Sequence, residues 1–344
     1  MLLTNDLHKG SKIKLFTHND LDGIGCEILG RLAFTNIDVT TVRNPNEASI
    51  KVGEFVSNGE FLNYDKIFIT DISVDEATAN LIDDLEWESH RFALLDHHGT
   101  ADYLNKYEWA SVQVKGRMGK EAGTNLFFEY LVMSGFFVRE NYRDALTIFV
   151  EKVRRYDCWE WKDIYNDEEA LELNTLFFLL GRKDFVNNYI RKFKNINPFI
   201  VREGSWIQMF DKSDRTIIEV DNRKKDAYIK RKEKQMIAKK LLGHKVGVVF
   251  AEQYISELGN VLSENNPDLK FIIMIDMGSR KVSYRTVHND IDLGRNIAQV
   301  FGGGGHAKAS GSTFSSKVAD HTFNLVFGLG LIGFVKKFLD KFSK

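Results

Sequence analysis

The sequence has little proline, little cysteine and almost no net charge. Only 3 of its 344 residues are proline, while 43% are hydrophobic and 28% are charged, which is typical of a folded globular protein rather than a disordered one. Its two cysteines, Cys26 and Cys158, are too few for a disulfide framework and fit a reducing compartment. We therefore expect a cytoplasmic protein that is long enough for two domains.

A signal peptide and a long hydrophobic run are also lacking. The first residues do not have the charged-then-apolar build of a secretion signal. The apolar run from Phe323 to Val335 is too short to cross a bilayer, which needs about 20 residues. We expect no stable membrane insertion, and we interpret this run as a packed C-terminal helix.

The charges are distributed unevenly along the chain. The formal net charge is -1, so no global basic field exists for holding long nucleic acids. Residues 182–240 nevertheless contain 17 Lys or Arg against 8 Asp or Glu, which leaves the rest of the chain at -10. This asymmetry indicates a cation site in the acidic part and a phosphate-facing or linker surface in the basic part.

Acidic side chains follow three predicted strands, at the point where each strand ends. Residues 12–17 lead into His18-Asn19-Asp20-Leu21-Asp22-Gly23, residues 65–70 into Asp71, and residues 91–95 into Asp96-His97-His98. The alternation of strands with helical stretches predicts a parallel sheet with right-handed crossovers. All three acidic motifs should then meet at its carboxyl edge, where ligands bind in such sheets.

The first motif has two interpretations. One acid could simply cap a helix over residues 25–34, but capping needs one acid, and the motif has two acids and a histidine. At alternate positions of an extended loop, His18, Asp20 and Asp22 would point to one side. A fourth acid, Asp157, follows a predicted helix over 141–155 within an aromatic run, either as a solvated residue or as a rigidly held ligand.

The second half of the chain predicts another α/β domain, after a charged helix over 221–240. Strands are expected at 245–250, 271–276 and 281–286, with a helix over 255–262. Four consecutive glycines, 302–305, precede His306, Lys308 and Ser310. Such a loop can be a flexible hinge, or it can bring backbone N–H groups against a phosphate.

Together these motifs resemble the DHH phosphoesterase superfamily with a DHHA1-type C-terminal domain, and within it the bacterial oligoribonucleases. The resemblance spans nearly the whole chain and rests on His18–Gly23, Thr70-Asp71, Asp96-His97-His98, Tyr156-Asp157, and Gly302–His306 with Ala309-Ser310-Gly311. It implies an α/β architecture: an N-terminal parallel-sheet DHH catalytic domain over 1–190, a helical basic linker over 191–240, and a smaller α/β DHHA1 substrate-binding domain over 241–344.

The resemblance also implies a site with two divalent metal ions, most often Mn²⁺. Asp71 would bridge the ions; His18 and Asp20 would complete one site, and Asp22, His97 and Asp157 the other. His18 precedes Asp20 by two residues, whereas many relatives have a spacing of four. The implied catalytic residues are His98, facing the scissile phosphate, and Asp96, orienting the motif. The implied substrate-binding residues are Arg285, Gly303, Gly304, Gly305, His306 and Ser310.

The function implied is that of a two-metal phosphodiesterase, a 3′–5′ exoribonuclease that degrades short RNA (nanoRNA) to 5′-mononucleotides. A near-neutral net charge suits a substrate with few phosphates. Two alternatives keep the chemistry and change the substrate: a 3′-phosphoadenosine 5′-phosphate phosphatase, or a phosphodiesterase for linear or cyclic dinucleotides. A third is a non-catalytic nucleotide-binding module. The expected partner is short single-stranded RNA or a small nucleotide. Whether the chain forms a homo-oligomer is left open by the sequence.

Overall fold

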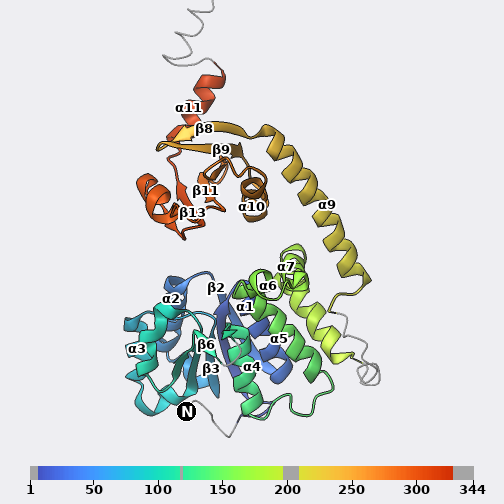
Figure 1. Ribbon diagram of the computed structural model, residues 1–344. Helices are drawn as coiled ribbons and strands as arrows, with labels where there is room; N and C mark the ends of the chain where they lie inside the picture. Colours follow the sequence, from blue (N-terminus) through green and yellow to red (C-terminus); the bar gives the residue numbers. More distant parts are fainter. Residues whose placement is uncertain (1–6, 117–118, 197–208, 328–344) are drawn as a thin grey trace, which may run out of the picture. The chain divides into compact units, whose positions relative to one another are not determined.

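The computed structural model describes residues 7–116, 119–196 and 209–327. The chain divides into two compact units, residues 1–218 and 219–344, and each is described by itself (Figure 1). The domain boundaries expected at residues 190 and 240 stay a prediction.

The N-terminal unit is built on the predicted parallel sheet. Five strands are arranged in the order β2-β1-β3-β4-β5, and all neighbours pair in parallel. Their bounds are Lys12–His18 (β1), Asn36–Val42 (β2), Lys66–Thr70 (β3), Phe92–Asp96 (β4) and Ala110–Val112 (β5). Every residue of β3 and β4 is buried, because helices cover both faces of the sheet. The parallel sheet and its class are therefore as predicted, although strands β2 and β5 were not foreseen.

Each face of the sheet has its own hydrophobic core. Leu15 of β1 packs with four helices on one face, whereas the next residue, Phe16, packs with two helices on the other. The helices of the first face are α1 (Leu21–Ala33), α4 (Gly123–Met133), α5 (Arg143–Asp157) and α7 (Glu168–Lys194), and those of the second are α2 (Pro45–Ser57) and α3 (Glu76–Asp83). Both cysteines are buried in this unit and are free.

Short elements complete the N-terminal unit. They are the 3₁₀-helices η1 (Glu60–Asn63), η2 (Glu86–Arg91) and η3 (Gly99–Lys106), the two-stranded ribbon β6 (Lys115–Gly116) and β7 (Gly119–Lys120), and helix α6 (Glu160–Asp163).

The C-terminal unit contains the predicted second sheet. Six strands are arranged in the order β12-β13-β11-β10-β9-β8, and only β9 and β10 pair in parallel. The bounds are Ile237–Leu241 (β8), His244–Phe250 (β9), Ile272–Asp276 (β10), Lys281–Arg285 (β11), Gly304–Gly305 (β12) and Ala309–Thr313 (β13). The helices are α9 (Lys212–Gln235), which leads into the unit, α10 (Ile255–Asn265), η4 (Leu293–Ile297), η5 (Ala298–Phe301) and α11 (Lys317–Val326).

One predicted element is wrong over part of its length. The charged helix expected over 221–240 ends at Gln235, and residues 237–241 form the edge strand β8. The reason is a tight turn: Leu242 and Gly243 both have positive φ, 49° and 81°, so that Leu241 pairs with His244 in a two-residue hairpin. Two lysines within β8 suit an exposed sheet edge.

The apolar C-terminal run lies partly outside the described residues. Helix α11 covers its beginning, where Phe323 and Val326 are exposed rather than packed. Within the described part of the chain, no helix combines the length and the apolar character that spanning a membrane requires.

Candidate metal centre

Three strands of the N-terminal sheet bring acids and imidazoles to one edge. Strand β1 ends at His18, Asp71 follows β3, and β4 ends at Asp96, directly before His97. Because these strands are parallel neighbours, their carboxyl ends lie together. Helix α5 adds Asp157, its last residue, to the same place.

The first group of ligand atoms consists of His18, Asp20 and Asp71. Nδ1 of His18 lies 2.7 Å from Oδ2 of Asp20 and 3.8 Å from Oδ2 of Asp71. Asp20 also caps helix α1, because its Oδ1 accepts a hydrogen bond from the Gly23 N–H at 3.1 Å. The capping interpretation therefore holds for Asp20, and the residue contributes to the acidic group as well.

The second group consists of Asp22, His97 and Asp157. Nε2 of His97 lies 3.7 Å from Oδ2 of Asp22 and 3.5 Å from Oδ2 of Asp157. The extended loop expected over 18–22 is wrong, because α1 already begins at Leu21 and the helical turn directs Asp22 away from the first group. In each group the ligand atoms lie within 4.8 Å of one another, so both groups could hold a metal ion.

Asp22 is held by backbone donors that sequence reasoning missed. Its two carboxylate oxygens accept hydrogen bonds from the N–H groups of Gly123 and Thr124, at 2.6 and 2.8 Å, at the start of α4. Residue 123 has to be glycine, since a Cβ there would lie 2.4 Å from the Cβ of Asp71.

Asp71 belongs to the first group and also contacts His97 of the second. Among the described residues, only one of its two carboxylate oxygens has a hydrogen-bond partner. Its Oδ1 is 3.2 Å from Nε2 of His97, whereas its buried Oδ2 accepts no hydrogen bond from any described residue. Its φ of 56° is left-handed, a strained conformation that concentrates at functional sites. Burial, followed by the charges of Asp22, Asp20 and Asp157, raises the pKa of Asp71 well above its usual value.

The pKa of Asp157 is raised by neighbouring negative charges, as that of Asp71 is. Burial and the charges of Asp22 and Asp20 raise its pKa to about 8. Several carboxylates gathered in a buried place need either protons or cations to be stable. A divalent cation would satisfy both groups, and the free oxygen of Asp71 points to the same requirement.

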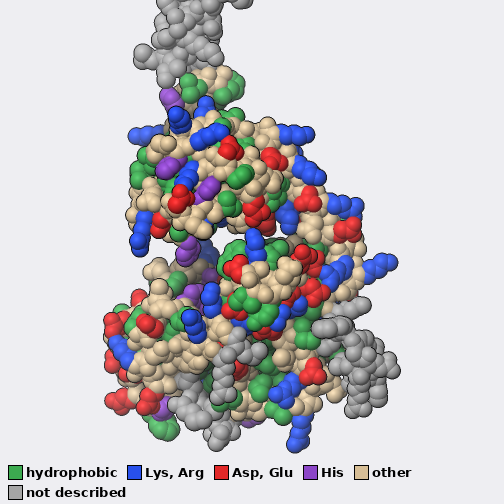
Figure 2. All heavy atoms as spheres, viewed as in Figure 1, with side chains coloured by type: hydrophobic (Ala, Val, Ile, Leu, Met, Phe, Trp, Pro, Cys, Tyr) green, Lys and Arg blue, Asp and Glu red, His purple; other side chains and the backbone are tan. Residues whose placement is uncertain are grey.

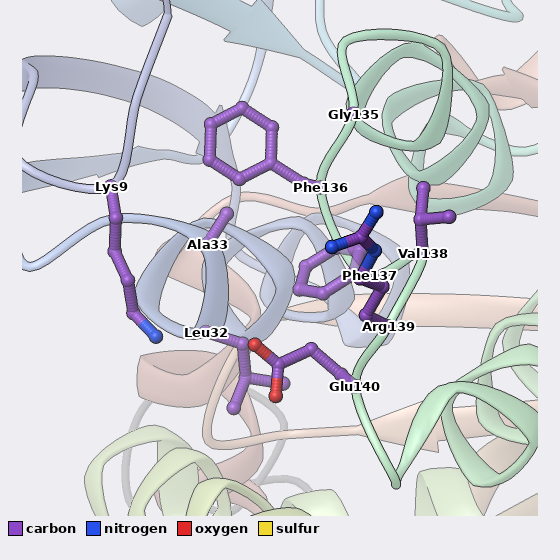
Figure 3. Close-up of a pocket in the computed structure, with 9 residues that line it drawn as sticks. All are labelled: Lys9, Leu32, Ala33, Gly135, Phe136, Phe137, Val138, Arg139 and Glu140. Atoms are coloured by element: carbon purple, nitrogen blue, oxygen red, sulfur yellow. The ribbon is translucent and has the colours of Figure 1, made fainter.

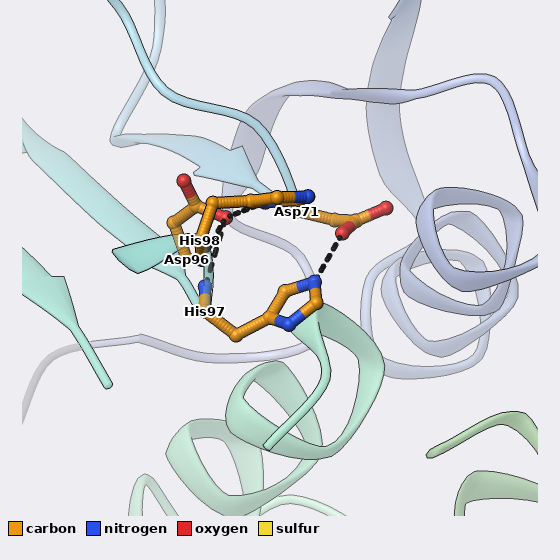
Figure 4. Close-up of side chains that lie close together, drawn as sticks. All are labelled: Asp71, Asp96, His97 and His98. Carbon is orange, nitrogen blue, oxygen red and sulfur yellow. Dashed lines mark hydrogen bonds and ion pairs between the residues drawn. The ribbon is translucent and has the colours of Figure 1, made fainter. Parts of the chain in front are cut away.

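His98 and Asp96 form a pair beside the two groups (Figure 4). Nδ1 of His98 lies 2.8 Å from Oδ1 of the fully buried Asp96, whose Oδ2 accepts a hydrogen bond from Ser73. Hydrogen bonding to Asp96 raises the pKa of His98 to about 9. Burial raises the pKa of Asp96, but the hydrogen bonds and charge of His98, together with Ser73, outweigh burial and leave that pKa below its usual value. Asp96 orients His98 through this contact. Asp71, Asp96, His97 and His98 also form a third group whose ligand atoms lie within 4.8 Å of one another.

The predicted substrate-binding residues lie together in the C-terminal unit. Strand β12 pairs with β13, with Gly305 opposite Ser310, and β13 pairs with β11, which ends at Arg285. The Arg285 guanidinium is half-buried and donates to the Tyr284 carbonyl and to Oγ of Ser256, at 2.9 and 3.2 Å. His306 is exposed, and the buried hydroxyl of Ser310 has no partner among the described residues.

Most of the glycine run has a structural reason. A Cβ at Gly303 would lie 2.0 Å from the Gly311 carbonyl oxygen, and one at Gly305, whose φ is 132°, would lie 2.7 Å from Cα of Ser310. Gly302 and Gly304 have open space around the position of a Cβ, but Gly302 has a left-handed φ of 71°.

A separate pocket lies at the other end of the N-terminal sheet (Figure 3). It has a volume of about 540 Å³ and is lined by Lys9, which precedes β1, by the end of α1, and by residues 135–140. The pocket lies near the amino end of β1, whereas the acidic groups lie at the carboxyl end of that strand. The pocket is therefore not part of the candidate metal centre.

Comparison with known proteins gives relatives along most of the chain. No protein-family model matches it. The chain is 38% identical over 306 residues to the oligoribonuclease NrnB of Bacillus subtilis, a match that covers 88% of this chain and 73% of that protein. It is 22% identical over 334 residues to a 3′,5′-cyclic-nucleotide phosphodiesterase of Helicobacter pylori, covering 86% and 90% of the two chains.

A solved structure shares the fold. The DHH domain of a member of a family of ribosomal proteins superimposes with a TM-score of 0.55 at 15% identity, covering 96% of this chain and 87% of that one.

Proposed function

The chain belongs to the DHH phosphoesterase superfamily, in the family of oligoribonuclease NrnB, and on this basis we propose that it is a two-metal 3′–5′ exoribonuclease. Its substrates would be short RNA oligonucleotides, and its products 5′-mononucleotides. The coarser statement, that the chain is a phosphoesterase, follows from the family; the reaction, the ions and the substrate length are the proposal.

The observation that carries the proposal is the buried Oδ2 of Asp71, which has no hydrogen-bond partner among the described residues. Oδ2 lies 3.8 Å from His18 of the first group and Oδ1 lies 3.2 Å from His97 of the second, and burial together with three further acids raises the pKa of the carboxyl. A structural carboxylate would have acquired hydrogen-bond donors on both oxygens, as Asp96 has from His98 and Ser73. An oxygen kept free among acids and imidazoles is instead suited to a shared divalent cation.

The donor set supports Mn²⁺ as the ion. Carboxylates and imidazoles, with no thiolate among them, favour such a metal over a thiolate-selected one. His18, Asp20 and Asp71 would hold one ion, and Asp22, His97 and Asp157 the second, with Asp71 shared. When bound, two such metal ions supply a nucleophile at neutral pH and neutralise negative charge on the phosphate.

The protein's own residues would act on the leaving group. With a pKa of about 9, His98 is protonated at neutral pH, and Asp96 fixes its ring through Nδ1. Its other nitrogen, Nε2, is then free to donate a proton to the 3′-oxygen that departs when the terminal nucleotide is released. The half-exposed ring suits contact with a substrate.

Substrate binding is proposed for the C-terminal unit. Arg285 offers a guanidinium for a phosphate; Ser310 lies on the neighbouring strand β13, Gly304 on β12 beyond it, and His306 in the turn between β12 and β13. The nearly neutral chain as a whole suits a substrate with few phosphates.

One alternative has its own support. The relative from Helicobacter pylori is named as a 3′,5′-cyclic-nucleotide phosphodiesterase, so the same metal chemistry could serve a small nucleotide substrate. A phosphatase for 3′-phosphoadenosine 5′-phosphate would use it as well.

A digestion time course would separate these functions. End-labelled RNA of two to twenty nucleotides, 3′-phosphoadenosine 5′-phosphate, a cyclic mononucleotide and a cyclic dinucleotide would be incubated with Mn²⁺ and the protein, with Asp71→Ala as the control. We expect preferential loss of the shortest RNAs, one nucleotide at a time from the 3′ end. Preference for a small nucleotide would move the assignment to the alternative, and no metal-dependent turnover would contradict both.

A further inference from the structure

A tryptophan with an unusual backbone directly follows the metal centre. Trp159 lies two residues after Asp157, and its side chain is 55% exposed. Its φ of 62° and ψ of 8° are left-handed, a conformation that is rare and costly for a bulky residue. An exposed ring adds nothing to the core, so packing does not explain why a tryptophan occupies this strained backbone position.

The surrounding residues hold this conformation from both sides. The Lys120 ammonium donates to the carbonyl of Cys158 at 3.3 Å, and the Lys120 N–H donates to the Glu160 carboxylate at 3.2 Å. Glu160 also accepts a hydrogen bond from the buried guanidinium of Arg154 at 2.7 Å. Lys120 thus contacts the residues on both sides of Trp159, and Arg154 holds Glu160 as well, so the strained conformation is maintained by its neighbours.

The ring of Trp159 is the exposed end of an aromatic stack. Its centroid lies 6.0 Å from that of Trp161, at an interplanar angle of 31°, and Trp161 stacks on Tyr156 at 6.5 Å and 21°. The Tyr156 hydroxyl accepts a hydrogen bond from the Asn174 side chain at 2.7 Å, which fixes the inner end. The stack therefore presents a rigid, flat apolar surface immediately after a metal-centre acid.

Other features of this region suit a nucleotide. Further apolar side chains are exposed in α7 and in the segment that precedes it, namely Ile164, Tyr165, Phe178 and Leu179, and hydrophobic side chains gather over this region in Figure 2. Lys115 and Lys120 are directly opposite each other in the β6–β7 ribbon. Like charges so placed repel, and an anion between them would relieve the repulsion.

We propose that Trp159 is a nucleobase-stacking subsite, with Trp161 behind it and Lys120 beside it. It would take the base of a nucleotide whose phosphate lies at the metal centre. This inference rests on the proposed function and adds to it the way in which a base is recognised. Stacking tolerates every base, because each has a π-face, so the subsite would favour nucleotides over other phosphoesters without selecting sequence.

The substitution Trp159→Gly removes the ring and keeps the backbone, because glycine adopts a left-handed φ without strain. We expect the KM for a dinucleotide RNA to rise about tenfold or more, with a much smaller change in kcat. Trp159→Phe should restore most of the affinity. Trp87→Ala, at a tryptophan that is 79% exposed in the same unit, is the matched control and should leave the KM unchanged.

A binding measurement separates this inference from the proposed function. AMP and ribose 5-phosphate differ by the base alone, and calorimetry with Mn²⁺ present gives their affinity ratio for the full chain. We expect wild type to prefer AMP about tenfold and Trp159→Gly to lose the preference. If that holds while wild type degrades no RNA, the subsite stands and the exoribonuclease fails.

Other outcomes overturn the subsite. If wild type degrades short RNA but Trp159→Gly keeps both its KM and its preference for AMP, the exoribonuclease stands without the subsite. If Trp159→Gly instead converts a dimer to a monomer with an unchanged AMP ratio, the ring packs against a second copy of the chain, and the inference is wrong.

Discussion

The metal centre of the N-terminal unit and the glycine loop of the C-terminal unit are both unusual runs in the sequence, but the fold explains only one of them. In the loop, Gly303 and Gly305 are required because backbone passes within van der Waals contact of where a Cβ would be. In the metal centre, nothing in the packing requires Asp71, whose buried Oδ2 has no donor among the residues described.

The difference teaches how to weigh such runs. A costly residue that the fold itself requires says little about ligands, since its cost is already offset by packing. A residue whose free-energy cost is not offset by packing indicates a ligand that the chain itself does not contain. The cations are therefore the better supported part of the account, and the phosphate-binding role of the loop rests on family resemblance. Four changes would sharpen or break this comparison.

The largest effect is expected from Asp71→Asn. Turnover should fall by about 10³-fold or more, because the shared ligand of the charge-stabilising ions is lost. The free energy of unfolding without metal should rise, because a buried acid among acids is removed. Metal-dependent turnover and urea unfolding in EDTA measure the two effects.

The control for that change is Asp75→Ala on the following helix. Asp75 caps α3 by accepting from the Thr78 N–H at 2.8 Å, so its loss should cost about 1 kcal/mol and leave turnover unchanged. Loss of stability on changing Asp71 would mean that the acid serves the fold, and the contrast with the glycine loop would disappear.

The next effect is a pH dependence of the metal-free protein. The pKa of Asp157 is raised to about 8 in the folded state, so the folded protein binds more protons than the unfolded chain between about pH 4 and 8. Its contribution to stability is present below pH 4 and is lost as the pH rises toward 8, at a cost on the order of 5 kcal/mol. Urea unfolding in EDTA at several pH values should show that the free energy of unfolding declines less steeply with pH for Asp157→Asn than for wild type. Equal declines in the two proteins would contradict the repulsion between Asp157 and the neighbouring acids.

A smaller effect is expected for His98→Asn. It should lower kcat by about 10²-fold, because the proton donor is removed, while Mn²⁺ binding stays close to that of wild type. Steady-state kinetics and calorimetry would be measured side by side. A loss of metal affinity equal to that of Asp71→Asn would make His98 a ligand instead of a proton donor.

The smallest effects belong to the glycine loop. Gly303→Ala should destabilise the protein by about 2 kcal/mol, since the new methyl meets a backbone carbonyl, whereas Gly304→Ala should leave stability unchanged. If backbone groups of the loop bind a phosphate, Gly304→Ala raises the KM a few-fold. An unchanged KM would leave the glycines with a packing role only.

Strands β3 and β4 could be predicted because they are continuous apolar runs that end in acids, whereas no order of strands in the sheet was predicted. Strand β2 was missed because it is a half-exposed edge strand with four polar residues, which gives no apolar pattern. Helix α7 was missed as well, and Gly181, at φ 73°, interrupts its helical periodicity. Strand β8 was read as helix because its lysines continue the charged pattern of α9.

Most acids and histidines of the candidate metal centre could be singled out from the sequence because they follow predicted strands, and family motifs divided them between two ions. Their supports could not, because the N–H groups of Gly123 and Thr124 leave no side-chain signature, and Ser73 is an ordinary residue until the fold brings it to Asp96. The backbone of Trp159 was equally unpredictable, since its φ depends on contacts made by Lys120 and Glu160.

The central claim is that two divalent ions share Asp71, and counting bound Mn²⁺ tests it most directly. Calorimetric titration of the metal-free full chain, checked by elemental analysis after dialysis, would give the stoichiometry for wild type and for Asp71→Asn. The account predicts two ions per wild-type chain and the loss of at least one in the variant. A single ion in wild type, or two ions bound equally well by the variant, would contradict it.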